Sequence, residues 1–323
     1  MAVFTPITFS EATSWIETNY SLGQVTALDG IESGIENSNF FLTTQNNNEK
    51  HEFVLTIFER LTAGQLPYYL ELMLFLAKNE IAVPAPMMTL SGGVFAELKG
   101  KPAAVISKLS GKPAMQPQST HCEQVGLMLA KLHLTGKNFT LHQENLRSLS
   151  WWQKTIPTIL PHVSEEQRQL LLSELSAQEL FFNSSLYQKL PEGPSHCDLF
   201  RDNVLFIDSS TPLLSGFFDF YFAGKDKWLF DLAVTVNDWC IDQNTGKFLP
   251  PLLQSTLESY KRIRTFTPEE QEAWPMMLRS AALRFWVSRL WDFYLPREAK
   301  LLAPHDPNHF EIILKDRIKS YAY

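Results

Sequence analysis

The feature that most constrains this chain is residues 195–206, SHCDLFRDNVLF, where polar side chains crowd directly before an apolar run. The apolar segments NVLFI and LSGFFDF predict two short strands joined by DSSTP. A loop that must hold several polar groups in fixed places needs rigid support, which a buried strand pair provides. We therefore expect the functional residues to gather in this loop.

The spacing within the loop indicates a type of reaction. Asp198 and Asn203 lie five positions apart, and Asp219 stands at the end of the second predicted strand. Phosphoryl transfer to a hydroxyl can use an Asp to orient that hydroxyl, with an Asn and a second Asp at this spacing as magnesium ligands. Amide and carboxylate oxygens are ligands that Mg²⁺ accepts. The pattern predicts a phosphotransferase site with Asp198 as base and Asn203 and Asp219 as metal ligands.

The rest of the chain divides into a β-rich part and a helical part. Alternating apolar residues predict strands with cores at 40–43 and 53–58, reversed by the Asn-rich QNNNEK. A stretch rich in Gly, Pro, Ser and Gln near 108–118 predicts a boundary, and Thr120 and Glu123 have the spacing of a capping box that would begin the next helix. Apolar periodicity and start signals predict further helices over 8–20, 148–160, 164–182, 230–242, 250–263, 268–295 and 307–320.

Charge and cysteine content argue against several classes of function. The chain carries 28 Lys and Arg against 35 Asp and Glu, a formal net charge of −7, which argues against a general nucleic-acid-binding protein. Three widely spaced cysteines without a CxxC pair indicate reduced thiols, not a disulfide framework or a zinc site. The sequence contains no run of about 18 apolar residues, the length that a membrane span needs. Its N-terminus lacks the pattern of a secretory signal. We expect a cytoplasmic protein that acts on small molecules.

These motifs resemble the kinase-like phosphotransferase superfamily, in its aminoglycoside-phosphotransferase and choline-kinase branch. SHCDLFRDNVLF is similar to the H-x-D-x-x-x-x-N loop of that branch, GFFDF to its metal-binding segment, and LFDLAV at 229–234 to its D-[LI]-A element. With GIESGIENSNFFL and DPNHFEIIL, the whole chain most resembles bacterial homoserine kinases of the aminoglycoside-phosphotransferase type. The resemblance implies an α+β, protein-kinase-like two-lobed fold, with a small antiparallel β-sheet N-lobe and a mainly helical C-lobe.

The resemblance also implies a function for each lobe. Residues 1–108 would form a nucleotide-binding lobe, and residues 109–323 a catalytic and acceptor-binding lobe. The enzyme would use ATP and Mg²⁺ to phosphorylate the hydroxyl of L-homoserine, a step in threonine biosynthesis. His196 and Asp231 would support the catalytic loop. The residues expected to contact the nucleotide are Gly34, Asn37, Ser38, Asn39, Ser107 and Leu109.

One position departs from the superfamily. A Lys or Arg usually stands on the third strand to hold the nucleotide phosphates, but our alignment puts Thr56 there. Lys50 and Arg60 are possible substitutes. The departure leaves open a nucleotide-binding pseudokinase as an alternative to an active enzyme.

The acceptor is a second open question. Homoserine carries a carboxylate, which an Arg can bind through both oxygens, and an ammonium, which needs an anion. The candidates for the carboxylate are Arg201, Arg284 and Arg289; those for the ammonium are Asp202, Asp238 and Asp292. Arg289 and Asp292 lie three apart on one predicted helix, so a local ion pair is the simpler interpretation of both. Choline, an aminoglycoside or methylthioribose remain alternative acceptors, and the sequence leaves the oligomeric state open.

Overall fold

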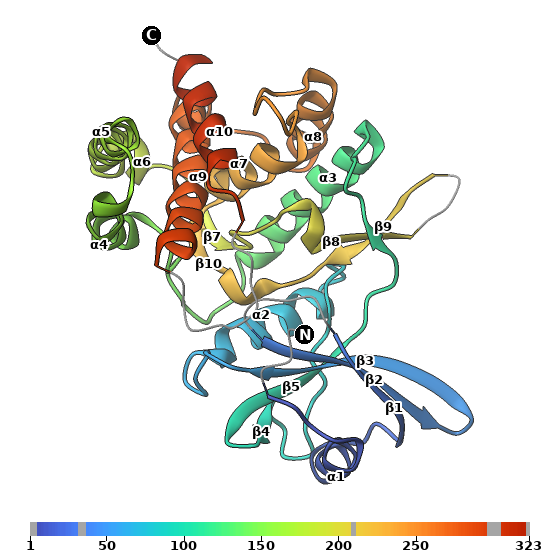
Figure 1. Cartoon of the computed structure of the whole chain (residues 1–323). Coiled ribbons are helices and arrows are strands. Elements are labelled where there is room, and N and C mark those ends of the chain that lie inside the picture. Colours follow the sequence, from blue (N-terminus) through green and yellow to red (C-terminus); the bar gives the residue numbers. More distant parts are fainter. Residues whose placement is uncertain (1–4, 32–36, 208–210, 296–304, 321–323) are drawn as a thin grey trace. The chain divides into compact units, whose positions relative to one another are not determined.

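A computed structural model of the chain describes residues 5–31, 37–207, 211–295 and 305–320. The chain divides into two compact units, residues 1–110 and 111–323. The predicted α+β architecture is confirmed, because the first unit contains an antiparallel sheet and the second is mainly helical (Figure 1).

The N-terminal unit is built on a five-stranded antiparallel sheet in the order β1-β2-β3-β5-β4. Asn47 and Asn48 take positive φ angles between β2 and β3, as the two central residues of a tight hairpin turn do. Lys99 and Gly100 make the same kind of turn between β4 and β5. The strands are β1 Gln24–Gly30, β2 Asn37–Asn46, β3 Glu49–Phe58, β4 Ala96–Leu98 and β5 Lys101–Ser107.

Helix α1, Phe9–Asn19, covers one face of this sheet. It begins at Thr8, whose side chain accepts the Glu11 N–H in a capping box, as predicted. The apolar side chains of α1 and of this sheet face form one core, which includes Trp15, Ile16, Phe40, Leu42, Leu55, Ile57 and Val105. Helix α2, Leu66–Lys78, follows β3 and has Pro67 in its first turn, where a missing N–H costs nothing.

The C-terminal unit contains two small sheets. The predicted strand pair is confirmed as β8, Val204–Ile207, and β9, Leu213–Phe217, which are antiparallel with Val204 opposite Phe217. β6, Lys112–Pro113, adds a third strand. The second sheet pairs β7, Glu192–Ser195, with β10, Gly224–Lys227. Neither of these strands was predicted, because EGPS and GKDK show no apolar alternation.

Helices make up the rest of the C-terminal unit, and α9 packs against both α7 and α10 (Figure 1). The prediction that Thr120 and Glu123 cap α3 is wrong. The helix begins at Ser119, and the Gln118 N–H donates to His121 Nδ1 over 3.1 Å, so Thr120 lies within the first turn.

Among the described helices, none combines the length and the apolar character that a membrane span requires. The helices are α3 Ser119–Gly136, α4 Leu149–Ile159, α5 Glu165–Phe182, α6 Ser185–Gln188, α7 Trp228–Trp239, α8 Pro250–Ile263, α9 Pro268–Tyr294 and α10 Asn308–Ser320.

Candidate active site

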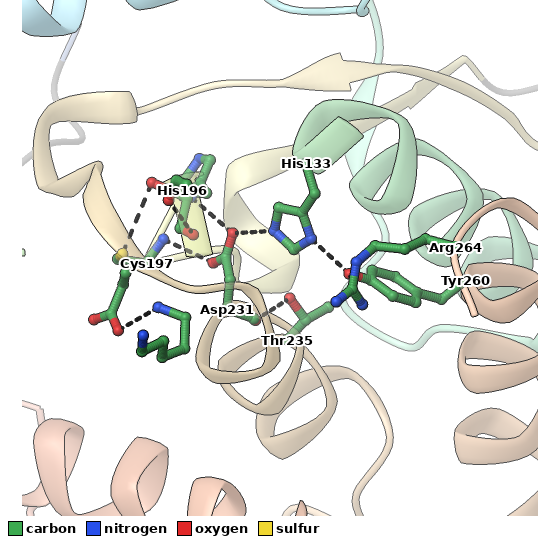
Figure 2. Close-up of polar contacts among 11 residues, drawn as sticks. His133, His196, Cys197, Asp231, Thr235, Tyr260 and Arg264 are labelled. Atoms are coloured by element: carbon green, nitrogen blue, oxygen red, sulfur yellow. Dashed lines mark hydrogen bonds and ion pairs between the residues drawn. The ribbon is translucent and has the colours of Figure 1, made fainter. Parts of the chain in front are cut away.

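The loop that carries Asp198 is held from beneath by Asp231, in the first turn of α7. The Asp231 carboxylate accepts the backbone N–H groups of His196 and Cys197, each over 2.7 Å (Figure 2). Cys197 has a φ of 62°, which is costly for a residue with a side chain, and its bond to Asp231 helps to hold that backbone in place. Asp231 therefore fixes the direction in which the chain enters the polar loop.

Behind Asp231 runs a buried chain of hydrogen bonds that the sequence did not reveal. His133, on α3, lies between Asp231 (Nε2 to Oδ2, 3.0 Å) and Tyr260 (Nδ1 to Oη, 2.7 Å), as Figure 2 shows. Arg264 donates to the Tyr260 hydroxyl over 3.2 Å and also pairs with Glu270. This direction of donation makes Tyr260 the donor to His133 Nδ1, and leaves His133 Nε2–H to donate to Asp231.

The pKa values in this chain fit a neutral His133 and an ionised Asp231. Burial lowers the pKa of His133, and the hydrogen bond that His133 donates to Asp231 offsets only part of that effect. For Asp231, burial alone would raise the pKa, but the hydrogen bonds that the carboxylate accepts from His133 and from the His196 N–H bring the pKa below its ordinary value. An ionised, fully buried carboxylate with this many donors is a rigid anchor.

Two further hydrogen bonds connect the loop to the segment that carries Asp219. His196 Nε2 lies 2.9 Å from the Phe218 carbonyl, and the Phe218 N–H donates to the Asn203 carbonyl over 3.0 Å. Asp219 comes next and adopts the left-handed conformation, φ 63° and ψ 61°. The backbone of Phe218 thus brings both ends of the polar loop to the residue before Asp219.

Asp198 and Asn203 face one another within the loop. Asn203 Nδ2 donates to the Asp198 carbonyl over 2.9 Å and lies 3.5 Å from Asp198 Oδ2. Burial raises the pKa of Asp198 to about 8; Arg284 counteracts this rise and Asp219 adds to it. The charge of Asp219 thus acts on Asp198, and the shared site of these two carboxylates stays a prediction.

The donor set at this site suits magnesium. Asn203 directs its amide nitrogen at Asp198 and would offer its amide oxygen as a ligand, and Asp219 would supply a carboxylate. Mg²⁺ takes only one or two protein ligands and completes its shell with water and phosphate oxygens. The described residues hold no group of three or more His, Cys, Asp or Glu that could form an all-protein metal cage. His305, Asp306 and His309, which are among the described residues, form no such group.

The three arginines predicted for the acceptor have different surroundings. Arg201 is engaged through all its side-chain nitrogens: Nε donates to Asp238 Oδ2 over 3.1 Å, Nη1 to the Met115 carbonyl, and Nη2 to the Asp238 carbonyl. It therefore serves as a brace for the loop. Arg289 lies over the Phe310 ring at 4.6 Å.

Arg284 stands apart from both. It is 3% exposed, and its Nη2 lies 3.9 Å from Asp198 Oδ1. This places one buried guanidinium at the carboxylate predicted to be the base.

In the N-terminal unit, the residues predicted to contact nucleotide occupy β2 and the end of β5. Gly34 lies outside the described residues. The Ser38 hydroxyl donates to Glu59 over 2.6 Å and accepts the Thr5 N–H over 2.9 Å, and Lys101 pairs with the same Glu59. This ion pair was not predicted from the sequence.

The other predicted nucleotide contacts differ in their freedom to bind. Thr56, at the position where a Lys is usual, donates to Asn39 Oδ1 over 2.8 Å. Asn37 is buried at the start of β2, and Leu109 is half-buried after β5. The Ser107 hydroxyl accepts the Ala85 N–H over 2.8 Å.

Comparison with known proteins places this arrangement in context. Residues 28–270 match the family described as "Phosphotransferase enzyme family". The homoserine kinase of Ralstonia nicotianae is 54% identical over 323 residues, covering 99% of this chain and 96% of that protein. The homoserine kinase of Paraburkholderia phytofirmans is 55% identical over 327 residues, covering 100% and 97%.

Solved structures confirm the predicted fold at much lower identity. Amicoumacin kinase hAmiN, solved in complex with AMP-PNP, Ca²⁺ and Ami, has a TM-score of 0.70 at 12% identity, covering 98% of this chain and 94% of that one. A microcompartment-associated aminopropanol kinase has a TM-score of 0.62 at 14% identity, with 97% and 98% covered. Both likenesses concern the fold alone.

Proposed function

This chain belongs to the phosphotransferase enzyme family, and from that membership we propose that it is a homoserine kinase, which uses ATP to phosphorylate the hydroxyl of L-homoserine. The observation that carries the proposal is the convergence of Asp198, Asn203 and Asp219 at one loop and one strand end. An enzyme of this kind would contribute to threonine biosynthesis. Its three free, buried cysteines, Cys122, Cys197 and Cys240, support a location in the reducing cytoplasm.

Each residue of the loop has a part in the transfer. Asp198 accepts a hydrogen bond from the acceptor hydroxyl, orients its oxygen toward the γ-phosphorus and receives the proton as the new O–P bond forms and the bond to ADP breaks. Asp231 and His196 hold the loop in place, so that the Asp198 carboxylate is presented to the acceptor in a fixed direction.

Asn203 and Asp219 would hold the magnesium ion that accompanies the nucleotide. When bound, that ion neutralises negative charge on the phosphates as the phosphoryl group is transferred. Burial is the main cause of the raised pKa of Asp198; a cation beside Asp219 would offset the further rise that the Asp219 charge adds, and so would favour the ionised form of the base.

Nucleotide contacts would come from the N-terminal unit, through Asn37, Ser38, Asn39 and the backbone near Ser107 and Leu109. The Thr56–Asn39 hydrogen bond suggests how the unit works without a third-strand Lys. It fixes the Asn39 amide oxygen on Thr56 and leaves the amide N–H groups to serve as neutral donors to a phosphate.

The test is the formation of ADP from ATP and Mg²⁺ with L-homoserine, and with choline, an aminoglycoside and methylthioribose as competing acceptors. We expect the product with L-homoserine to be O-phospho-L-homoserine, which phosphorus NMR can identify.

Asp198→Asn should lower kcat by roughly 10²- to 10⁴-fold. Asp242→Asn is the matched control, because the Asp242 side chain accepts turn hydrogen bonds from residues 244 and 245, which an Asn can also accept. Turnover of another acceptor in preference to L-homoserine would refute the substrate assignment; no turnover of any acceptor would favour a pseudokinase.

A further inference from the structure

Arg284 is a buried cation with few partners. It lies on α9, is 3% exposed, and its Nε has no hydrogen-bond partner among the described residues. Its guanidinium carbon lies 3.8 Å from the centroid of the Phe285 ring and 5.4 Å from that of Phe222. Its Nη2 lies 3.9 Å from Asp198 Oδ1, at the limit of an ion pair. Burying a charge with so little compensation is costly, which indicates that an anion completes its surroundings.

A second arginine approaches the same ring. Arg147, in the segment between α3 and α4, has its guanidinium carbon 6.0 Å from the Phe222 centroid and 4.6 Å from that of Trp151. Arg147 is half-buried. Burial lowers the pKa of Arg284 to about 10; Asp198 opposes this and the charge of Arg147 adds to it, so the two cations act on each other.

Phe222 connects these arginines to the catalytic residues. It ends the short helical turn at 220–222 that directly follows Asp219. The Phe222 ring, which both Arg147 and Arg284 approach, therefore belongs to the segment that carries the predicted metal ligand.

We propose that Arg284 and Arg147 bind the α-carboxylate of the amino-acid acceptor and so select it over alcohols that lack a carboxylate. This inference rests on the proposed function, since it concerns the acceptor of the same reaction. Arg284 is well placed to bind the carboxylate of the acceptor, because its Nη2 is close enough to Asp198 for one small molecule to contact both residues. In homoserine the hydroxyl oxygen and the carboxylate carbon are roughly 5 Å apart when extended and closer when bent, given bond lengths of about 1.5 Å.

The other predicted arginines fit this role less well. Arg201 has its donors committed to Asp238 and Met115, and Arg289 lies against Phe310 with Asp202 and Asp238 among the charges that act on it. Arginine suits a carboxylate because its guanidinium can donate to both oxygens at once. Two guanidinium groups converging on one ring can bracket such a group.

The test compares two acceptors that differ by the carboxylate, L-homoserine and 3-aminopropan-1-ol. Arg147→Met should lower kcat/KM for L-homoserine on the order of 10²-fold, and the ratio of kcat/KM for the two acceptors should fall by a similar factor. Arg284→Lys keeps the buried charge but loses the planar pair of donors, and should also lower the ratio. Arg262→Met, at an exposed arginine of α8 that pairs with Glu123, is the matched control and should leave the ratio unchanged.

Binding of a non-reacting analogue gives a second measurement. L-2-Aminobutyrate is homoserine without its hydroxyl, and its inhibition constant should rise in Arg147→Met, whereas that of propan-1-amine should not. Equal losses for both acceptors would overturn the inference, because the arginines would then act on the phosphoryl group or on folding. An unchanged ratio and unchanged inhibition would also overturn it. Failure of the wild-type protein to phosphorylate L-homoserine is a different result, and would count against the proposed function itself.

Discussion

His133 lies 3.0 Å from Asp231, Nε2 to Oδ2, and both side chains are fully buried. The two residues lie 98 positions apart in the chain, on α3 and α7. A further hydrogen bond connects Asp231 to the catalytic loop. Asp231 Oδ2 also accepts the His196 N–H, and Oδ1 accepts that of Cys197. The position of the predicted base, Asp198, therefore depends on groups that touch no substrate.

Replacing Asp231 should damage the reaction more than replacing its partner. In Asp231→Asn, one amide oxygen remains to accept two backbone N–H groups, and the new amide N–H₂ faces a donor. We expect kcat to fall on the order of 10²-fold, while His133→Gln, which can still donate to Asp231, should lose roughly tenfold or less. Steady-state kinetics with saturating ATP, Mg²⁺ and L-homoserine measure both.

The control for this comparison is Asp306→Asn, because Asp306 accepts the Asn308 N–H at a helix start and an Asn can do the same. Circular dichroism should show all three variants folded. A larger loss in His133→Gln than in Asp231→Asn would mean that the loop does not depend on Asp231.

Acid should destabilise the protein through the buried His133. Its pKa is lowered in the folded state, chiefly by burial, so near pH 6 the unfolded chain binds a proton there that the folded chain does not. The stability contributed by neutral His133 is thus present above the unfolded pKa of about 6.5 and is lost as the pH falls below it. Comparison with His133→Gln cancels the other titrating groups.

We expect the difference in free energy of unfolding between wild type and His133→Gln to shrink by about 1 kcal/mol as the pH falls from about 7 to about 5.5. Urea unfolding at several pH values gives this difference. His142→Gln, at an exposed histidine beside Glu144, is the control for the replacement of a histidine by glutamine. A difference that stays constant across this range would show that His133 is not held neutral in the fold.

The sequence predicted what local patterns determine. The strands of the first sheet follow from apolar alternation and from the turn at Asn47 and Asn48, whose short amide side chains tolerate positive φ. The catalytic loop follows from the fixed spacing of Asp198 and Asn203 before a buried strand. Both signals are formed by residues that are close together in the chain, so a single sequence is enough to detect them.

The parts that were not predicted depend on contacts between distant segments. His133 alone on an apolar helix looks like a core residue, and only the fold brings it to Asp231 and Tyr260. The strands β7 and β10 pair through backbone groups and carry polar side chains such as Glu192 and Lys227, which join in an ion pair at 2.7 Å. No periodicity marks such strands, because their stability comes from the partner strand.

The predicted metal ligands give a separate test. Asp219→Asn replaces a carboxylate with a neutral amide and should raise the Mg²⁺ concentration needed for half-maximal activity by at least about tenfold, since even outer-shell changes cost that much in metal sites. Titration of activity with MgCl₂ at fixed ATP measures it, with Asp242→Asn as the control. If Asp219→Asn and wild type require the same Mg²⁺ concentration, Asp219 is not a ligand.

The contact between α3 and α8 should tolerate no side chain at Gly126. A Cβ atom there would lie 2.2 Å from Ser259 Oγ and 2.4 Å from the Thr256 carbonyl oxygen, and the second of these is backbone that cannot rotate away. Gly126→Ala must therefore separate the two helices, and α3 also carries His133. We expect a loss of about 1–3 kcal/mol in the free energy of unfolding, the usual cost of overpacking, together with a modest decrease in kcat.

Gly64→Ala, where the nearest atom to a new Cβ is 4.0 Å away, is the control and should be neutral or slightly stabilising. Equal stability of Gly126→Ala and wild type in urea unfolding would show that these helices do not pack as closely as described, and would weaken the link from α8 through Tyr260 to the catalytic loop.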